Sequence, residues 1–265
     1  MVGEIVWLGR YPVKSMLGED LTEASLGPDG VAGDRRFALV DAETGLVASA
    51  KNPRKWRDLL RMRAAYGADG SLRITGPDGT PVGALDEVAG RPVRLVEERP
   101  DGAALERLTP QTEPGAGTMT TNPLGAAFPG RTFVDFAPVH VVTTATLDAL
   151  GADHRRFRPN VVVRMFDPAP FEENGWPGRA LTTGDSVALR IVVPTPRCVV
   201  PTLPQGEDLP EDPGVIRTAA RLNRVQVLDL GRLTCVGAYG AVAQEGTLRV
   251  GDLVHIDGPG VVGPA

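Results

Sequence analysis

The sequence predicts a mainly β protein with short helices, an α+β fold built around a β-barrel core. Glycine and proline are frequent for a chain of 265 residues, at 32 and 24, and neither is well tolerated inside helices. Short apolar runs recur between turn signals along most of the chain. These runs do not alternate with helices in the regular rhythm of a parallel α/β sheet, which favours a barrel decorated by helices.

The first half of the sequence contains apolar runs separated by clear turns. The strands at 36–41 and 46–50 form a predicted hairpin in which Gly45 takes a positive φ. The run KWRDLLRM at 55–62 has apolar residues at roughly helical spacing and predicts a short helical turn. Strands are expected in this half at 2–8, 36–41, 46–50, 72–75, 81–83 and 91–98.

Residues 99–131 are rich in Pro, Gly and Thr and show no clear periodicity. A connection of this length in a compact protein is usually a linker or a functional loop. We therefore divide the chain into an N-terminal domain at 1–105, a linker or loop at 106–130 and a C-terminal domain at 131–265.

The second half restarts with apolar strands and two helical segments. TTATLDALG at 143–151 predicts a short helix, with Thr143 or Thr144 as its N-cap and Gly151 as its stop. A helical turn is expected at 214–222. Strands are expected at 139–143, 160–165, 186–194, 225–230 and 248–256.

Composition limits the function classes and the compartment. The formal net charge is -5, from 28 Lys and Arg against 33 Asp and Glu, which disfavours a general nucleic-acid-binding surface. Two cysteines cannot form a disulfide framework and fit a reducing compartment. We see neither a run long enough to span a bilayer nor a signal-peptide core. We therefore expect a cytoplasmic protein that binds neither nucleic acid nor membrane.

The stretch PTPRCVVPT at 194–202 is the most informative part of the sequence. Cys198 follows Arg197 at the end of an apolar strand, and the flanking prolines fix the loop. A thiol on a rigid loop beside a cation can favour the thiolate, the form that binds metals or attacks electrophiles. The alternative is a small, inert structural cysteine, which is our interpretation of Cys235 in GRLTCVGAYG.

Two basic motifs suit a phosphate group. Lys14 and Ser15 in YPVKS offer an ammonium and a hydroxyl next to backbone N–H groups. Arg35 and Arg36 in GDRRF can bind a phosphate through paired hydrogen bonds. Strand alternation places these two arginines on opposite faces, so only one is expected to point inward. The alternative for each residue is a solvated surface charge.

Three further polar residues are candidates for ligand contacts. Arg158 and Asn160 in RFRPNVVV lie two apart and would face the same side of an extended segment. The alternative is a turn in which Asn160 bonds its own backbone. Asp135 in FVDFAP is a lone carboxylate in an apolar context. If Asp135 is buried, it needs partners or a shifted pKa, and otherwise it is an ordinary loop residue. The histidines are scattered without metal-ligand spacing: His140, His154 and His255.

Taken together, six motifs in order resemble the MOSC family. They are YPVKS, GDRRF, SAKNPR at 49–54, FRPNVVV, PRC, and GTLRVGD at 246–252. The match runs across almost the whole chain. It is similar to a MOSC N-terminal β-barrel domain packed on a MOSC β-barrel domain, an arrangement shared by the mitochondrial amidoxime reducing components and their bacterial relatives. The resemblance implies the molybdenum cofactor, a pyranopterin (molybdopterin) that holds molybdenum through its dithiolene.

The resemblance also implies roles for individual residues. Cys198 would be the protein ligand to molybdenum, and Asp135 falls where relatives place an acidic residue close to the metal. We take both as catalytic candidates. The implied cofactor-binding residues are Lys14, Ser15, Arg35 and Arg36 around the pterin phosphate, and Arg158, Asn160 and Arg197 elsewhere along the cofactor.

The activity that the resemblance implies is a two-electron reduction of small N-hydroxylated compounds, such as amidoximes, hydroxylamines or N-hydroxylated bases. Asp135 or water would handle the protons. We find no ferredoxin-like tail with clustered cysteines, so a separate donor would supply the electrons. That donor would be a ferredoxin-like or flavodoxin-like protein, or a cytochrome b5-like protein with its reductase. The chain is expected to act as a monomer.

Two other functions stay open. The chain could be a non-redox carrier of the cofactor or a sulfur-transfer module with a persulfide on Cys198, as in the MOSC domain of cofactor sulfurases. The missing desulfurase domain weakens that interpretation, and pyridoxal phosphate enters only as a family-level association. A β-barrel binding domain without redox chemistry is the third candidate.

The sequence departs from the family pattern in two places. The acidic, proline-rich segment after Cys198 prevents us from carrying over a substrate. SAKNPR differs from the threonine- and arginine-containing version of better-known relatives. We therefore carry over no cofactor contact to Ser49, Lys51 or Asn52.

Overall fold

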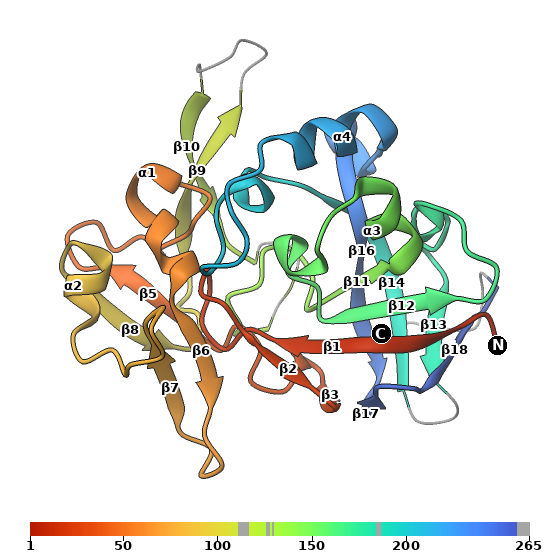
Figure 1. The fold of residues 1–265 in the computed structure, drawn as a ribbon, viewed down its shortest axis with the longest axis horizontal. Helices are drawn as coiled ribbons and strands as arrows, with labels where there is room; N and C mark the ends of the chain where they lie inside the picture. Colours follow the sequence, from red (N-terminus) through yellow and green to blue (C-terminus); the bar gives the residue numbers. More distant parts are fainter. Residues whose placement is uncertain (111–116, 126–127, 129, 184–186, 259–265) are drawn as a thin grey trace.

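The fold is mainly β, as predicted, and Figure 1 shows a computed structural model of it. The structure describes residues 1–110, 117–125, 128, 130–183 and 187–258. Among the described residues, seven strands close into a barrel. In order around the barrel they are β11 (Val139–Thr143), β12 (Val161–Met165), β1 (Gly3–Arg10), β18 (Leu253–Ile256), β13 (Ala180–Thr183), β14 (Val187–Pro196) and β16 (Arg232–Gln244), and β16 pairs back with β11.

The N-terminal strand β1 lies in this barrel with strands from the other end of the chain. It pairs antiparallel with β12, where Leu8 lies opposite Val161, and also with β18. The chain therefore leaves the barrel after Arg10 at the point where residues 158–160 enter it. A backbone hydrogen bond from the Gly9 nitrogen to the Asn160 oxygen (2.9 Å) joins the two segments. This register brings YPVKS and FRPN together although they are far apart in sequence.

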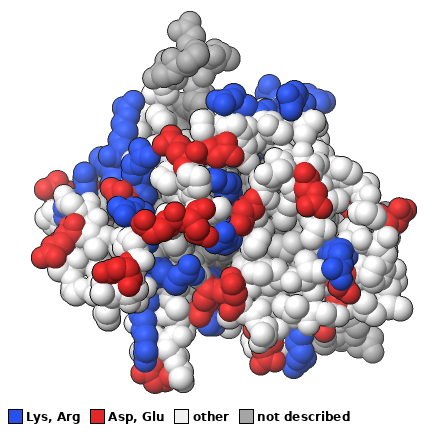
Figure 2. All heavy atoms as spheres, in the orientation of Figure 1, with Lys and Arg blue, Asp and Glu red and all other residues white. Residues whose placement is uncertain are grey.

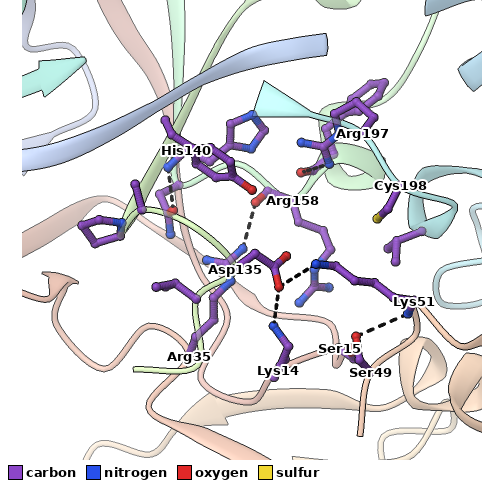
Figure 3. Close-up of a pocket in the computed structure, with 17 residues that line it drawn as sticks. Lys14, Ser15, Arg35, Ser49, Lys51, Asp135, His140, Arg158, Arg197 and Cys198 are labelled. Carbon is purple, nitrogen blue, oxygen red and sulfur yellow. Dashed lines mark hydrogen bonds and ion pairs between the residues drawn. The ribbon is translucent and has the colours of Figure 1, made fainter. Parts of the chain in front are cut away.

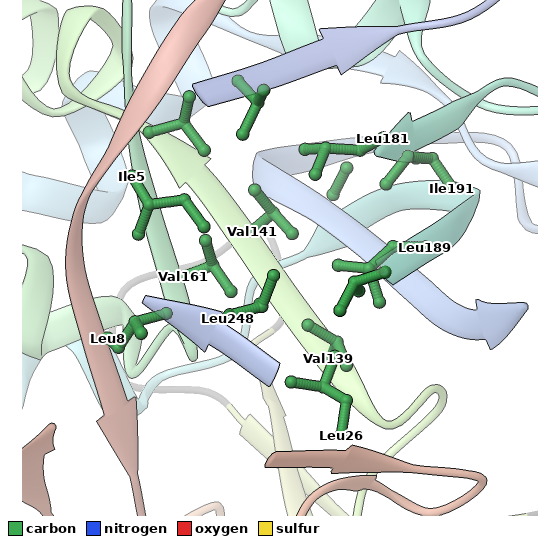
Figure 4. Close-up of a cluster of buried hydrophobic side chains, with 14 of the residues drawn as sticks. Ile5, Leu8, Leu26, Val139, Val141, Val161, Leu181, Leu189, Ile191 and Leu248 are labelled. Carbon is green, nitrogen blue, oxygen red and sulfur yellow. The ribbon is translucent and has the colours of Figure 1, made fainter. Parts of the chain in front are cut away.

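The barrel interior is filled with aliphatic side chains, shown in Figure 4. On β14, Val187, Leu189 and Ile191 are buried, whereas Arg190 between them is exposed. This alternation follows from the two-residue repeat of a strand.

Two short strands extend the sheet: β2 (Glu19–Leu21) pairs with β1, and β15 (Arg224–Gln226) pairs with β16.

The rest of the first half forms small sheets, and a second core here contains Val13, Met16, Leu39, Trp56 and Leu59, whereas Leu26 and Leu248 belong to the barrel core. The sheets are β5 (Phe37–Asp41) with β8 (Val93–Glu97), β6 (Arg63–Tyr66) with β7 (Leu72–Thr75), β9 (Ala104–Pro110) with β10 (Gly117–Pro123), and β3 (Glu23–Gly27) with β4 (Gly30–Val31) and β17 (Gly246–Arg249). The helical segments here are α1 (Pro53–Trp56), η1 (Arg57–Arg61) and α2 (Leu85–Ala89).

Short helices decorate the barrel. The predicted helix at 143–151 is confirmed as α3 (Thr144–Leu150): the Thr143 hydroxyl accepts from the Thr146 nitrogen, and Gly151 ends the helix with φ +58°. The other helical segments are α4 (Gly214–Leu222), η2 (His154–Phe157), η3 (Glu172–Gly175), η4 (Val200–Thr202) and η5 (Leu228–Leu230). Within the described part of the chain, none of the helices combines the length and the apolarity needed to cross a bilayer.

Several predicted strands differ from the structure. The prediction of a strand at 46–50 is wrong, because only Val47 in this range makes isolated bridges. The positive φ predicted for Gly45 is confirmed at +71°. The strand at 81–83 is likewise reduced to one bridge at Pro81. The strand at 225–230 ends at Gln226 and continues as the helical turn η5. The strand at 248–256 is split into β17 and β18 by a turn at Gly251 (φ +94°).

The expectation of a connection without secondary structure at 99–131 is also wrong. Strands β9 and β10 pair with each other across this segment. Their side chains are mostly half-buried or exposed, so a burial pattern gave no signal. The long strand β16 escaped prediction because glycines interrupt it. Gly237 has φ +77°, and a Cβ there would lie 2.5 Å from the Val141 carbonyl oxygen of the neighbouring strand. The division of the chain at 106–130 stays a prediction.

Leu189→Ala should lower the free energy of unfolding by about 2–5 kcal/mol, because it leaves a cavity in the closed barrel. Leu189 is completely buried. Arg190→Ala on the same strand should change stability by less than about 0.5 kcal/mol, because its side chain is exposed. Urea unfolding measures both values, and equal losses would contradict the assigned faces of β14.

Candidate functional site

Five of the six motifs singled out in the sequence converge on one cleft, which we call the anion cleft (Figure 3), whereas no residue of GTLRVGD lines it. Its empty space is about 660 Å³, open solvent at its mouth included. The loop after β1, the loop before β5, the segment before β12 and the loop after β14 all reach it. The predicted site residues that line it are Lys14, Ser15, Arg35, Asp135, Arg158, Asn160, Arg197 and Cys198.

Arg36 lies elsewhere. Its side chain is 52% exposed and pairs with Glu97 on the surface. Arg35 faces the cleft because its backbone is left-handed (φ +48°) and precedes the strand, so the choice between the two arginines is made by a turn and not by strand alternation.

Three of the six described non-glycine residues with a positive φ line this cleft. Ser15 (φ +64°) and Arg158 (φ +56°) are left-handed like Arg35. The backbone conformation is uncommon for residues other than glycine, and it persists where the surrounding structure holds it, often at functional sites. Arg158 caps the 3₁₀ helix η2, and its nitrogen donates to the His154 and Arg155 carbonyls. The turn points the Arg158 side chain into the cleft.

Asp135 joins two lysines at the centre of the cleft. Its Oδ1 lies 2.8 Å from the Nζ of Lys14 and 2.8 Å from the Nζ of Lys51. Desolvation by the surrounding protein would by itself raise the pKa of Asp135, whose side chain is 34% exposed, but the two ammonium groups outweigh this effect and hold the pKa well below its usual range. Burial lowers the pKa of Lys14 to about 8, against the opposing effect of Asp135. Lys14 also donates to the Phe133 carbonyl at 2.8 Å.

Two arginines of the cleft lie over the ring of Tyr11, a buried residue outside the cleft lining. The guanidinium carbon of Arg158 lies 4.3 Å from the ring centroid, and that of Arg35 lies 4.9 Å from it. Arg35 pairs with buried Asp34 and donates to the Arg158 carbonyl at 3.1 Å. By contrast, both terminal nitrogens of Arg158 are buried without a hydrogen-bond partner among the described residues. Burial and then the charge of Arg35 lower the pKa of Arg158 to about 10.

The cleft therefore holds more positive charge than it neutralises. Among the described lining residues, five are Lys or Arg and one is a carboxylate. His140 adds no charge at neutral pH, because burial and then Arg197 lower its pKa to about 3. Buried cations with free donors form a site for an anion of more than one charge, such as a phosphate group.

Asn160 positions strands at the cleft wall. Its Oδ1 accepts from the His140 nitrogen (3.1 Å), and its Nδ2 donates to the Gly9 carbonyl (3.2 Å). The amide thus ties β11 to the end of β1. It does not bond its own backbone, which was the alternative interpretation of this segment.

Cys198 provides a free thiol in the same cleft, and its side chain is partly exposed. The loop is held on both sides: the Arg197 nitrogen donates to the Thr234 carbonyl (2.9 Å), and Pro201 lies in the following turn η4. Cys235 is fully buried in β16. No group of three or more His, Cys, Asp or Glu side chains in the described ranges could hold a metal ion.

Four polar lining residues were not among the predicted site residues: Ser49, Lys51, His140 and Tyr239. Lys51 lies in SAKNPR, the motif that departs from the family pattern, and its ion pair with Asp135 depends on tertiary structure. Asn52 of that motif is buried and donates to Glu106, away from the cleft lining. Tyr239 gave no signal, because it lies in the glycine-interrupted strand β16.

Comparison with known families matches the two halves of the chain. The MOSC N-terminal beta barrel domain matches residues 2–99, and the MOSC domain matches residues 130–255. The chain is a MOSC-domain protein. The MOSC protein is 26% identical to mitochondrial amidoxime-reducing component 1 of Mus musculus over 97% of its own length and 83% of that protein. It is 24% identical to the Homo sapiens protein of the same name, over 97% of its own length and 84% of that protein.

One solved structure is similar along the whole chain. The YUAD protein from Bacillus subtilis is 13% identical to the MOSC protein and covers 97% of it, with 96% of its own chain aligned and a TM-score of 0.44.

The affinity of the cleft for sulfate should fall as pH rises through about 8, where Lys14 loses its proton. Sulfate keeps its charge over this range, so the change reports on the protein. Asp135→Asn should move the fall to lower pH, because Asp135 favours the charged form of Lys14. Calorimetric titration of each protein with sulfate between about pH 6.5 and 9.5 measures the affinity and its fall. A fall that persists in Lys14→Met would contradict the assignment to Lys14.

Arg158→Met should stabilise the protein by about 1–2 kcal/mol while weakening sulfate binding, because it removes a buried charge without a partner. Methionine keeps an apolar stem of similar length over Tyr11. Thermal unfolding and sulfate titration of one sample measure both effects. Loss of stability together with loss of binding would mean that Arg158 is a structural residue.

Proposed function

We propose that the MOSC protein is a molybdenum-cofactor-dependent oxidoreductase that reduces N-hydroxylated compounds with electrons from a separate redox partner. The observation that carries the proposal is the free thiol of Cys198 in a cleft lined by five cationic side chains. The two features match the two parts of the cofactor, which are a metal that needs a thiolate and a pterin that carries a phosphate.

The residues present fit this cofactor. The unpartnered guanidinium of Arg158 has donors for phosphate oxygens, and Lys14 and Arg35 lie beside it as further cations. The Ser15 hydroxyl accepts a hydrogen bond from the Ala50 nitrogen (3.0 Å), and this bond fixes the loop that contains Lys14. Cys198 would supply one thiolate to a metal that already has dithiolene sulfurs. When bound, the cofactor supplies a metal centre that takes up and passes on two electrons.

The proposed reaction breaks one N–O bond. The N-hydroxylated compound takes up two electrons and two protons and yields the amine or amidine and water. Asp135 has too low a pKa to donate a proton near neutral pH, so we assign it the role of positioning Lys14 and Lys51. Among the residues of this cluster, Lys14 has a proton whose pKa lies close to neutrality.

The relatives support the proposed reaction class. Both carry the name amidoxime-reducing component, and the alignment spans 97% of the MOSC protein in each case. All of the aligned cleft motifs lie within this span.

The proposed electron donor is an acidic redox protein. Figure 2 shows Lys and Arg atoms along the top edge of the molecule over α4, where Arg217 and Arg221 are exposed. Arg224 and Arg232 are exposed on the neighbouring strands β15 and β16. Positive surface of this kind steers and orients an acidic partner.

Both cysteines are free thiols, which suits a reducing cytoplasm.

Purified MOSC protein should contain about one molybdenum atom per chain, and Cys198→Ala should lose it, because this variant removes the proposed metal ligand. Cys235→Ala is the matched control, since Cys235 is buried away from the cleft, and it should keep the metal. Elemental analysis by mass spectrometry measures all three proteins.

Activity is tested on the same samples. Reduced wild-type protein should convert an aryl amidoxime to the amidine, and Cys198→Ala should not. Wild-type protein with full molybdenum content that leaves amidoximes and hydroxylamines unchanged would contradict the proposed reaction. A persulfide on Cys198 in protein without pterin would favour sulfur transfer in its place.

A further inference from the structure

A second cavity adjoins the anion cleft at Cys198, and we call it the apolar chamber. Its empty space is about 1310 Å³, open solvent included, against about 660 Å³ for the anion cleft. Five residues line both cavities: Lys51, Asp135, Arg197, Cys198 and Tyr239. The thiol therefore stands at the junction, where a molecule in one cavity meets a molecule in the other.

The walls of the chamber are largely aliphatic and aromatic. They come from the β9–β10 hairpin and the residue after it, from the loop before β11, from β14 and from the β15–β16 connection. The side chains that define these walls are Leu105, Leu124, Phe136, Val193, Leu230 and Leu233. Such a surface gains free energy by covering an apolar ligand and excluding water.

One wall is flat. The rings of Phe136 and Tyr239 lie 5.9 Å apart between centroids with an angle of 25° between their planes. Tyr239 extends this surface to the junction with the anion cleft. A planar aromatic ligand matches two stacked rings better than a branched or a small polar ligand does.

The two cavities differ in the charge that they accept. Beyond the five shared residues, the anion cleft has three cationic side chains in its lining, Lys14, Arg35 and Arg158. Beyond the shared residues, the described polar lining of the chamber is Arg107 and Asn122, on the hairpin strands. An anion is therefore favoured in the cleft and an uncharged body in the chamber.

We propose that the apolar chamber binds the uncharged aromatic body of the N-hydroxylated substrate and presents its N–O group at Cys198. The ligand class is aryl amidoximes and aryl hydroxylamines, in preference to small polar hydroxylamines. This inference rests on the proposed function, which it deepens by naming the substrate class.

Leu230 makes the proposal testable without disturbing the core. It lines the chamber although its side chain is 65% exposed, so it forms the lip. Leu228 lies on the same helical turn η5 with 58% exposure and is absent from the chamber lining. Glutamate at either position adds the same charge to the same turn. The pair thus separates an effect on the chamber from a general surface effect.

Binding is measured first, without turnover. The probe is a neutral naphthalene fluorophore (prodan), displaced by benzamidoxime, on the purified full chain. Leu230→Glu should weaken the binding of both ligands by about tenfold, because the substitution places a charge at the rim of an apolar site. Leu228→Glu should stay within about twofold of the wild type, as exposed substitutions do.

Turnover is measured second, as the ratio of kcat/KM for benzamidoxime to kcat/KM for hydroxylamine. The ratio should fall about tenfold in Leu230→Glu and stay unchanged in Leu228→Glu, because only the aromatic substrate uses the chamber. Equal effects of the two variants on the ratio or on prodan binding would overturn the proposal. So would a Leu230→Glu protein that changes only the KM for the electron donor, which would mark the chamber as a docking surface.

The proposed function and the proposed substrate site can fail separately. A wild-type protein that reduces neither compound overturns the proposed function. Prodan binding then tests the chamber without turnover. Selective loss of prodan binding in Leu230→Glu supports an aromatic site, and unchanged prodan binding in this variant overturns that site as well.

Discussion

An excess of buried positive charge is the constraint on which the rest of the site depends. The cleft buries Lys14 and Arg158 almost completely and leaves 15% of the Arg35 side chain exposed, and desolvation opposes the charge on each of them. Asp34 and Asp135 offset part of this excess through Arg35 and the two lysines. Arg158 has no such partner among the described residues. A protein keeps such an unfavourable arrangement where a ligand completes it, and here the missing component is an anion.

The barrel makes this charge cluster possible. Because β1 pairs with β12 and β18, the first and the last described strands are joined, and the loops after β1 and before β12 open on the same side. The loop after β14 arrives there through the pairing of β14 with β16, which sets Pro196 opposite Cys235. Three loops from distant parts of the sequence are thus fixed on one rigid scaffold. Binding sites on loops gain their precision from such a scaffold.

Much of the site could be predicted because its residues occur in short motifs with distinctive chemistry. The Pro-Arg-Cys loop and the Lys-Ser pair were visible without any contact information, and so were the strands whose apolar alternation reflects burial. Contacts that depend on tertiary structure were not visible. Lys51 reaches Asp135 across the fold, the left-handed turn at Arg35 selects it over Arg36, and Tyr239 lies in a strand broken by glycines. The apolar chamber combines a hairpin, a barrel strand and a helical turn that share no sequence pattern.

In the proposed site, a single protein thiolate would bind a metal that brings two sulfurs of its own. X-ray absorption at the molybdenum edge counts these sulfur neighbours directly. We expect three for the wild-type protein, two from the dithiolene and one from Cys198, and two for any metal retained by Cys198→Ser. A wild-type protein whose molybdenum has only the two dithiolene sulfurs would contradict the assignment of Cys198 as the metal ligand.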